Sequence, residues 1–349
     1  MANLKIVVLF GGASPEYPVS LRSAQAILEA MDPQRFTPVP VGITPDGQWY
    51  FYRGALSAIG TDTWRESEDC VPAMLSVNRG ERALLCFQGQ EIQRIYIDAV
   101  FPVLHGQNGE DGSVQGLCEL AGIPLVGCGT LASALCMDKD RAHRLAAQAG
   151  IPSPAGSIVP AGASAEFLHA QAHKLGYPLF VKPLKAGSSF GITRVTQRTQ
   201  LDSAAVLARQ YDDVLILEQA VAGFEVGCAV MGNEQLYIGE VDEIELSQGF
   251  FDFSEKYTLK SSKIHVPARI DAKTAERIKE TAETVYRALG CRGFARVDMF
   301  LTPDGQILFN EVNTIPGFTA HSRFPAMLKA AGFSFPQIVR FVIELAVRT

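Results

Sequence analysis

The chain has 349 residues, of which 47% are hydrophobic and 19% are charged, a balance typical of globular proteins and enough length for two or three domains. A net charge of -6 argues against a general nucleic-acid binder, and no apolar run reaches the roughly 18–20 residues of a membrane span. The seven cysteines are scattered and never spaced C-x-x-C, which indicates reduced thiols in a cytoplasmic protein.

Residues 1–126 alternate strand and helix patterns. The apolar run KIVVLF predicts a first strand rather than a signal peptide, because it continues into GGASPEYPVS without a cleavage pattern. Further predicted elements are a helix over 19–31, strands over 36–43 and 98–106, a short helix over 114–122 and a strand over 124–128. This alternation predicts an α/β domain with a doubly wound parallel sheet, which places the loops of Glu16 and His105 at one edge.

Residues 127–219 and 220–349 are predicted to form a central domain and a C-terminal domain of α+β type. Predicted elements are a helix over 131–150, a strand, Gly/Ser loop and strand over 177–195, strands over 214–221, 224–231 and 235–244, a helix over 271–290, a hairpin over 297–309 and a closing helix. The polar stretch 243–263 is predicted to be a flexible lid.

The hairpin carries a pattern that points to a cation. Asp298 lies on its first strand, and Glu311 and Asn313 follow on the next, two residues apart and therefore on one face. Carboxylate and amide oxygens suit Mg²⁺, which prefers oxygen ligands and retains water or phosphate. The alternative is an edge hairpin whose polar side chains face solvent.

Lys182 ends a predicted strand, and the loop Gly187-Ser188-Ser189 follows it. The lysine and the backbone N–H groups of such a loop can bind phosphate, although the P-loop pattern is absent and an ordinary hairpin turn fits the loop alone. Glu218 follows an apolar strand and is a candidate for holding adenine or ribose, or a solvated glutamate. Lys139 is either a second phosphate ligand or a helix-surface lysine.

Six motifs occur in an order that resembles the D-alanine–D-alanine ligase family. They are VLHGQNGEDGSVQG, MDKDRAHR, KPLKAGSSFGI, EKY, ARVDMF and NEVNTIPGFTAHSRFP. The resemblance covers essentially the whole chain and implies the ATP-grasp architecture. It also implies an enzyme that joins a D-amino acid to a second D-amino or D-hydroxy acid while splitting ATP to ADP and phosphate.

The resemblance assigns roles to residues of this chain. ATP would be bound by Lys139, Phe180, Lys182, Ser188, Ser189, Glu218, Glu225 and the lid residue Lys256. Two Mg²⁺ ions, which Mn²⁺ can replace, would be bound by Asp298, Glu311 and Asn313, with Glu311 bridging.

The substrate roles follow from the same resemblance. Glu16 would hold the ammonium of the first D-alanine, and Arg296 with the Gly317 backbone would stabilise an oxyanion. Ser322 would hold the carboxylate of the second substrate. The hydrogen-bonded set that closes the site would be Glu16, Ser188 and Tyr257. His105 is expected to orient the first substrate or its acyl phosphate, the alternative being an ordinary loop histidine.

The second substrate is suggested by the lid sequence. Residues 250–253 read Phe-Phe-Asp-Phe, and with Tyr17 and the EKY motif they look most like the D-alanine–D-serine ligases of vancomycin resistance. Tyr257 favours an amine acceptor over a hydroxy acid. We hypothesise that Asp242, Phe251 and Arg323 shape a subsite for a serine hydroxymethyl group. The alternative is a housekeeping D-alanine–D-alanine ligase. The resemblance further suggests a homodimer.

Overall fold

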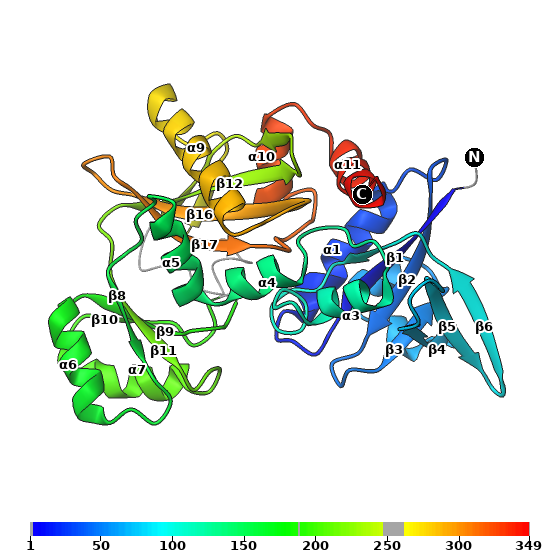
Figure 1. Ribbon diagram of the computed structural model, residues 1–349, viewed down its shortest axis with the longest axis horizontal. Coiled ribbons are helices and arrows are strands. Elements are labelled where there is room, and N and C mark those ends of the chain that lie inside the picture. The colour runs from blue at the N-terminus through cyan, green and yellow to red at the C-terminus, as the bar shows by residue number, and fades with distance from the viewer. Residues whose placement is uncertain (1–2, 188, 247–261, 349) are drawn as a thin grey trace.

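The computed structural model describes residues 3–187, 189–246 and 262–348, which form three sheets with their helices (Figure 1). The first sheet has the strand order β6-β5-β4-β3-β2-β1-β7. Its strands are β1 Leu4–Gly11, β2 Phe36–Ile43, β3 Trp49–Tyr52, β4 Cys70–Leu75, β5 Ala83–Gln88, β6 Glu91–Tyr96 and β7 Ala99–Pro102. An α/β domain was expected here and is found.

The pairing in this sheet corrects one part of the prediction. β1 is parallel to β2 and β7, but the strands from β2 to β6 pair in antiparallel fashion. Parallel neighbours need a crossover of about a dozen residues or more, whereas β5 and β6 are joined only by Gly89 and Gln90. The sheet is therefore mixed. The predicted strand over 124–128 is reduced to a single bridge between Val100 and Leu125.

Helices cover both faces of the first sheet. Side chains of β1 alternate, so Ile6 and Val8 share a buried cluster with α1 (Tyr17–Ala30), whereas Val7 lies in a separate cluster with α3 (Ser113–Ala121). The short elements of this region are α2 Ser57–Gly60 and a 3₁₀ turn over Trp64–Glu66. Gly122 ends α3 in the left-handed conformation, as the sequence predicted.

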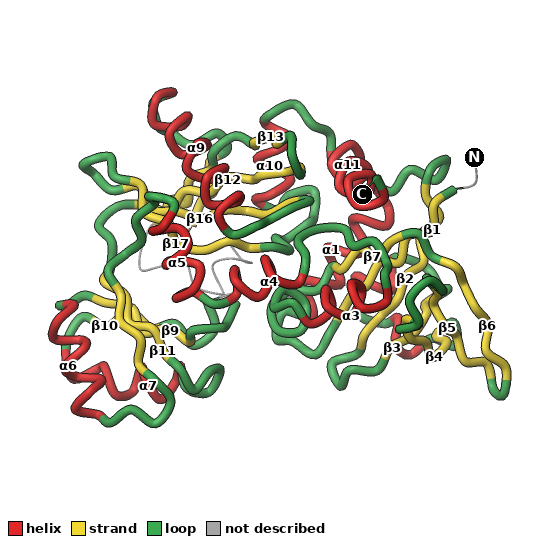
Figure 2. The backbone as a smooth tube through the Cα atoms, viewed as in Figure 1, coloured by secondary structure: helices red, strands yellow, loops and turns green. Residues whose placement is uncertain are grey.

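The second sheet is antiparallel and has the order β10-β9-β11-β8. Its elements are β8 Gly156–Val159, α6 Ala165–Leu175, β9 Leu179–Pro183, β10 Thr193–Val195, a 3₁₀ turn over Arg198–Gln200, α7 Leu201–Ala208 and β11 Leu215–Gln219. Its buried cluster comes entirely from residues between Val159 and Leu217, with α6 and α7 packed on one side (Figure 2). This unit therefore has a core of its own.

The third sheet follows the order β15-β14-β12-β16-β17, with β13 paired to β12. Its elements are β12 Phe224–Gly232, β13 Leu236–Ile238, β14 Asp242–Leu246, β15 Ser262–His265, α9 Ala272–Ala288, β16 Phe294–Leu301, β17 Ile307–Asn313, α10 Arg323–Ala330 and α11 Phe335–Val347. The predicted hairpin is thus β16 and β17. The single strand predicted over 235–244 is divided into β13 and β14, and most of the predicted lid lies outside the described residues.

The helix predicted over 131–150 is two helices, α4 (Thr130–Met137) and α5 (Lys139–Gln148). Asp138 separates them with extended backbone angles, and its carboxylate accepts a hydrogen bond from the N–H of Arg141. An aspartate favours such a cap over a helix interior, which explains the break. Both helices pack with the third sheet rather than the second. The division at 126/127 and 219/220 stays a prediction.

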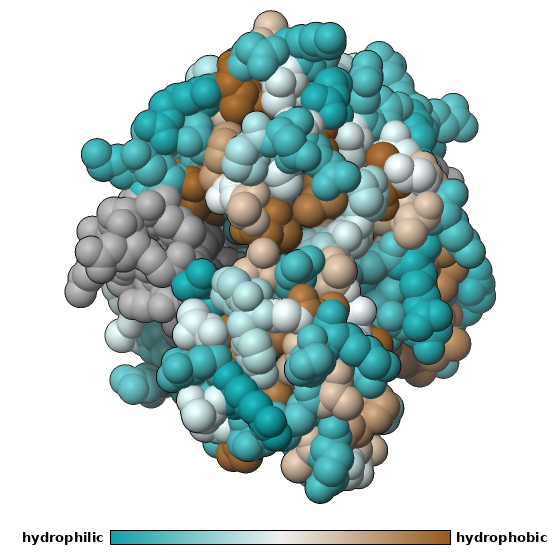
Figure 3. All heavy atoms as spheres, turned by 90° about the vertical axis from the view of Figure 1, so that its left-hand side faces the viewer, coloured by the Kyte–Doolittle hydropathy of each residue, from teal (hydrophilic) through white to brown (hydrophobic). Residues whose placement is uncertain are grey.

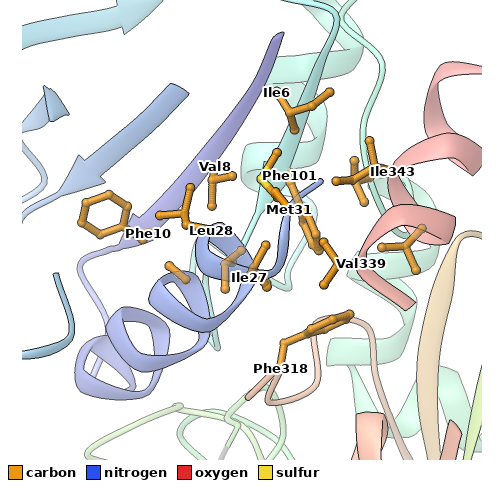
Figure 4. Close-up of a cluster of buried hydrophobic side chains, with 14 of the residues drawn as sticks. Ile6, Val8, Phe10, Ile27, Leu28, Met31, Phe101, Phe318, Val339 and Ile343 are labelled. Carbon is orange, nitrogen blue, oxygen red and sulfur yellow. The ribbon is translucent and has the colours of Figure 1, made fainter. Parts of the chain in front are cut away.

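One buried cluster joins the two ends of the chain. Figure 4 shows side chains of β1 and β7 facing those of α1, of α11 and of Phe318. The rings of Phe101 and Phe318 meet edge to face with centroids 5.8 Å apart, and Phe294 lies 5.4 Å from Phe318. The first and third sheets are therefore held together by a continuous hydrophobic core.

Hydrophilic residues cover most of the face drawn in Figure 3, and hydrophobic ones form small groups. Within the described ranges, we find no individual helix with the length and hydropathy needed to cross a membrane. Only α10 and α11 taken together have them, and these two helices meet at a bend of 102°.

Candidate active site

A cavity of about 320 Å³ lies between the second and third sheets. Its walls come from β9 and β11 on one side and from β12, β16 and β17 on the other. It gathers seven residues that the sequence assigned to ATP or metal, namely Lys139, Phe180, Lys182, Ser189, Glu218, Glu225 and Glu311. These residues are up to 172 positions apart in the chain, from Lys139 to Glu311, and the fold brings them together.

Lys182 and Glu218 form a buried ion pair in this cavity. They lie on the neighbouring strands β9 and β11, and Lys182 Nζ contacts Glu218 Oε2 directly. Burial alone raises the pKa of Glu218, but the charge of Lys182 outweighs it, so that the pKa is lowered and the carboxylate is ionised. Glu218 Oε1 is buried and accepts no hydrogen bond from the described residues. A bound group with an N–H or O–H donor, such as adenine or ribose, would satisfy it.

Lys139 is the first residue of α5, and its side chain is buried. Nζ donates a hydrogen bond of 2.8 Å to the carbonyl oxygen of Ala186 and lies 4.0 Å from Glu311 Oε2. The break at Asp138 directs this lysine, because it sets where α5 begins. Lys139 and Lys182 thus place two positive charges beside the acidic face of β17.

The four polar residues of the hairpin share one face of the sheet. Asp298 is paired in register with Glu311, and Arg296 with Asn313. Arg296 donates to both oxygens of Asp298, at 2.8 and 2.7 Å, and the Asn313 amide donates to Asp298 Oδ2 at 2.9 Å. A bulge between Asp298 and Met299 separates this polar pairing from the apolar remainder of the hairpin.

The donor chemistry of this face fits a hard cation. Within the described ranges no three His, Cys, Asp or Glu side chains form a metal-binding group, so the set that fits is mixed. It consists of the carboxylates of Asp298 and Glu311 and the amide of Asn313, a set with the oxygen donors that Mg²⁺ selects. Each carboxylate oxygen has more than one acceptor direction, so the hydrogen bonds of Asp298 do not prevent it from binding a cation.

Arg323, the first residue of α10, connects three acidic residues. Its guanidinium donates to both oxygens of Asp242, at 2.6 and 2.9 Å, and to Glu225 Oε1 at 2.9 Å. Its Nη2 also lies 3.3 Å from Asp298 Oδ1. Gly227 on β12 leaves room for this network, since a Cβ there would overlap the guanidinium and both aspartates. Sequence reasoning did not single out Gly227.

Ser322 precedes Arg323 and caps α10 without a side-chain bond to the helix. Its hydroxyl accepts a hydrogen bond from the N–H of Thr319 at 3.1 Å and lies 2.8 Å from the Thr319 hydroxyl. A Cβ built on Gly317 would be 3.2 Å from Ser322 Oγ, so the two predicted substrate-binding positions are adjacent.

The predicted first-substrate loops meet as expected. Glu16 is buried immediately before α1, and a Cβ at Gly106 would overlap its carboxylate. Gly187, from the Gly/Ser loop, approaches the same carboxylate from the second sheet. Predicted residues Ser188, Phe251, Lys256 and Tyr257 lie outside the described residues, so the set of Glu16, Ser188 and Tyr257 stays a prediction.

His105 and Glu110 connect this region to the third sheet. His105 Nδ1 lies 2.8 Å from Ile315 O, and Nε2 lies 3.3 Å from Ser23 Oγ. Burial lowers the pKa of His105 to about 4. Glu110 accepts hydrogen bonds from the N–H of Gly106 at 2.9 Å and of Ile315 at 2.8 Å. Burial and then the charge of Glu16 raise the pKa of Glu110 to about 8.

Glu110 was missed by sequence reasoning, although it lies inside the quoted motif VLHGQNGEDGSVQG. The signal was present, because a glutamate between two glycines next to a histidine is unusual for a plain loop. What the sequence did not show is its partner, which lies 205 residues further along the chain.

Comparisons with known proteins agree with this geometry. A family model described as "D-ala D-ala ligase N-terminus" matches residues 5–128, and one described as "D-ala D-ala ligase C-terminus" matches residues 145–344. The solved structure of VanG D-Ala:D-Ser ligase from Enterococcus faecalis superposes with a TM-score of 0.90 at 54% identity, covering 99% of this chain and 100% of that one.

Two curated relatives add to this picture. Vancomycin C-type resistance protein VanC1 of Enterococcus gallinarum is 46% identical over 98% of both chains. A putative D-alanine–D-lactate ligase of Streptomyces coelicolor is 44% identical over 99% of this chain and 98% of its own. The relatives therefore differ in the second substrate that their names state.

Two antiparallel sheets that enclose a polar cavity, with lysines on one wall and carboxylates on the other, define a ligase of the ATP-grasp fold. The two family models together span most of the sequence. The chain belongs to the D-alanine–D-alanine ligase family, and the predictions of fold class and of ligase activity are confirmed.

Proposed function

We propose that this enzyme joins D-alanine to a second D-amino acid, with D-serine favoured, through a D-alanyl phosphate formed from ATP. The observation that carries the proposal is the cavity between the second and third sheets, where Lys139 and Lys182 face Glu311. An ATP phosphate chain needs such cations, and it needs divalent metal to offset its remaining charge. Asp298, Glu311 and Asn313 would hold two Mg²⁺ ions, which supply that charge neutralisation when bound.

The residues divide the work of the reaction as follows. Lys139 and Lys182 bind the ATP phosphates, while Glu218 and Glu225 bind the adenine and ribose. Glu16 holds the D-alanine ammonium so that the carboxylate of D-alanine attacks the γ-phosphorus and displaces ADP.

The amine of the second substrate then attacks the acyl carbon, loses a proton and displaces phosphate. Arg296 has five N–H donors, and Asp298 takes one on Nε and one on Nη2. We assign Nη1, together with the Gly317 N–H, to the tetrahedral oxyanion. The lid 243–263 is proposed to exclude water, which would hydrolyse the acyl phosphate.

Two observations support D-serine as the second substrate. The VanG structure, a D-Ala:D-Ser ligase by its title, is 54% identical to this chain. In addition, Asp242 and Glu225 fix the Arg323 guanidinium beside Ser322, which provides a rigid polar wall for a hydroxymethyl group. A site that hydrogen-bonds a hydroxyl discriminates against the analogue lacking it. The corresponding role is in peptidoglycan precursor synthesis with vancomycin resistance, in the cytoplasm and as a homodimer.

The alternative is a housekeeping D-alanine–D-alanine ligase. Phosphate release from ATP and Mg²⁺ should be measured with D-alanine plus D-serine, D-alanine or D-lactate, near pH 7 and pH 9, with L-alanine as the negative control. We expect release with D-alanine and the highest kcat/KM for D-serine. A clear preference for D-alanine at both pH values would establish the alternative, and release that is equal with L-alanine would refute the ligase assignment.

A further inference from the structure

The loop from Ile315 to Phe318 belongs to the third sheet but is held by residues of the first. It directly follows β17 and contains Gly317. The side chains of Ile315 and Phe318 are buried, and the Phe318 ring packs on Phe101 of β7. Both anchors therefore lie on either side of the peptide that we assign to the oxyanion.

The hydrogen bonds at the Phe318 end form a chain with a defined direction. A carbonyl oxygen can only accept, so His105 Nδ1 carries the proton and donates to Ile315 O at 2.8 Å. The buried ring is neutral, which makes Nε2 an acceptor for the hydroxyl of Ser23 at 3.3 Å. Ser23 Oγ in turn accepts from the N–H of Phe318 at 3.2 Å. Every donor and acceptor in the chain is matched.

Glu110 completes the contact at the other peptide group of Ile315. One carboxyl oxygen accepts from the Ile315 N–H at 2.8 Å, and the other accepts from the Gly106 N–H at 2.9 Å. Ile315 is thus held through both its N–H and its C=O by two residues of one loop, His105 and Glu110. This two-point contact fixes the peptide in position and in orientation.

Helix α1 connects this contact to the first-substrate carboxylate. Glu16 precedes the helix, and Ser23 follows it by seven residues, which is two turns and about 10 Å along the same face. Glu16 also lies against Gly106, the residue that donates to Glu110. One rigid body therefore carries the group for the D-alanine ammonium and reaches the loop for its carboxyl end.

We propose that Ser23, His105 and Glu110 form a clamp that positions the Gly317 N–H relative to Glu16. The proposal rests on the function above, in which these two groups bind opposite ends of the first D-alanine. The clamp makes His105 a positioning residue that acts through Ile315 and Ser23. Misplacing reacting groups by about 1 Å costs up to about a hundredfold in rate, so loss of the clamp should lower kcat.

The chain offers a matched pair of variants for the test. Ser23→Ala removes the hydroxyl that joins His105 to the Phe318 N–H. Ser20→Ala removes an equally buried hydroxyl from the same helix, one that accepts from Gly11 N–H and donates to Val103 O within the first sheet. Both variants lose a buried hydrogen bond, but only the first loses contact with the loop at residues 315–318.

We expect Ser23→Ala to lower kcat by about ten- to a hundredfold while the Kd for ATP stays within twofold, and Ser20→Ala to change kcat by no more than about twofold. A double-mutant cycle of Ser23→Ala with His105→Asn should be strongly non-additive, because both changes interrupt one hydrogen-bonded chain. Hydrogen exchange of the amides in residues 314–318 should speed up in Ser23→Ala and not in Ser20→Ala.

Equal kcat values for the two alanine variants would overturn the clamp, and so would unchanged exchange at residues 314–318 in Ser23→Ala. Additive losses in the cycle would overturn the positioning role of His105 and return it to direct contact with substrate. The exchange measurement needs no turnover. Failure of the unaltered enzyme to release phosphate with D-alanine would therefore refute the proposed function while leaving the clamp tested separately.

Discussion

Replacing Arg323 with methionine tests whether the acidic network of the third sheet depends on one guanidinium. Asp242 is 0% exposed, and both of its oxygens are hydrogen-bonded by Arg323. Asp298 keeps its two hydrogen bonds from Arg296, so the main cost falls on Asp242. Leaving a buried charge without its partner costs about 3–5 kcal/mol, and we expect Arg323→Met to lower the free energy of unfolding by that amount.

Two further variants sharpen this measurement by urea unfolding followed with circular dichroism. Asp242→Asn in the Arg323→Met background should recover about 1–3 kcal/mol, because it removes the unpaired charge. Arg144→Met is the control, since Arg144 is 73% exposed and its 2.9 Å pair with Asp140 should contribute less than about 1 kcal/mol. If Arg323→Met unfolds like the control, or if the two changes at 323 and 242 are additive losses, the reasoning is wrong.

Three other predictions concern the nucleotide cavity, the buried histidine and the start of α5. Lys182→Met should raise the Kd for ATP at least about tenfold in a nucleotide titration, because a phosphate ligand is lost and Glu218 becomes a buried unpaired charge; an unchanged Kd would exclude Lys182 from the site. His105 has a folded pKa of about 4, below its usual 6.5, so the unfolded chain binds the proton more tightly. Stability should therefore fall by up to about 3 kcal/mol as the pH drops from 6.5 to 4, and His105→Asn should lack this loss; parallel pH profiles of the two proteins would contradict it. Asp138→Ala should lower the free energy of unfolding by about 1 kcal/mol through loss of the α5 cap, and a neutral effect would show that the cap is dispensable.

The sequence predicted elements best where local chemistry alone decides them. The hairpin of β16 and β17 follows from apolar runs around Pro303-Asp304-Gly305, and its polar face follows from the two-residue alternation of Asp298, Glu311 and Asn313. Helix α9 begins after Asp271 as the capping pattern indicated. Such features depend on neighbours within a few positions of the chain.

The features that sequence missed depend on distant partners. The antiparallel strands β3 to β6 are short and partly exposed, so their pairing is set by the turns and by the sheet they extend. The Arg323 network joins residues from 225 to 323, and the Glu110 contact joins two sheets. No periodicity reveals which buried carboxylate will meet which donor. At Asp138, a favourable cap overrode a helical pattern that ran on either side of it.

The shared hydrophobic core has a consequence for how the protein is made. Translation delivers β1 and α1 first, but α11, which covers the same cluster, is among the last residues to leave the ribosome. The apolar face of α1 therefore waits through almost the whole of synthesis for its cover. The second sheet, whose cluster ends at Leu217, is complete while the third is still being translated. The first part of the nascent chain to emerge is thus the last to finish folding.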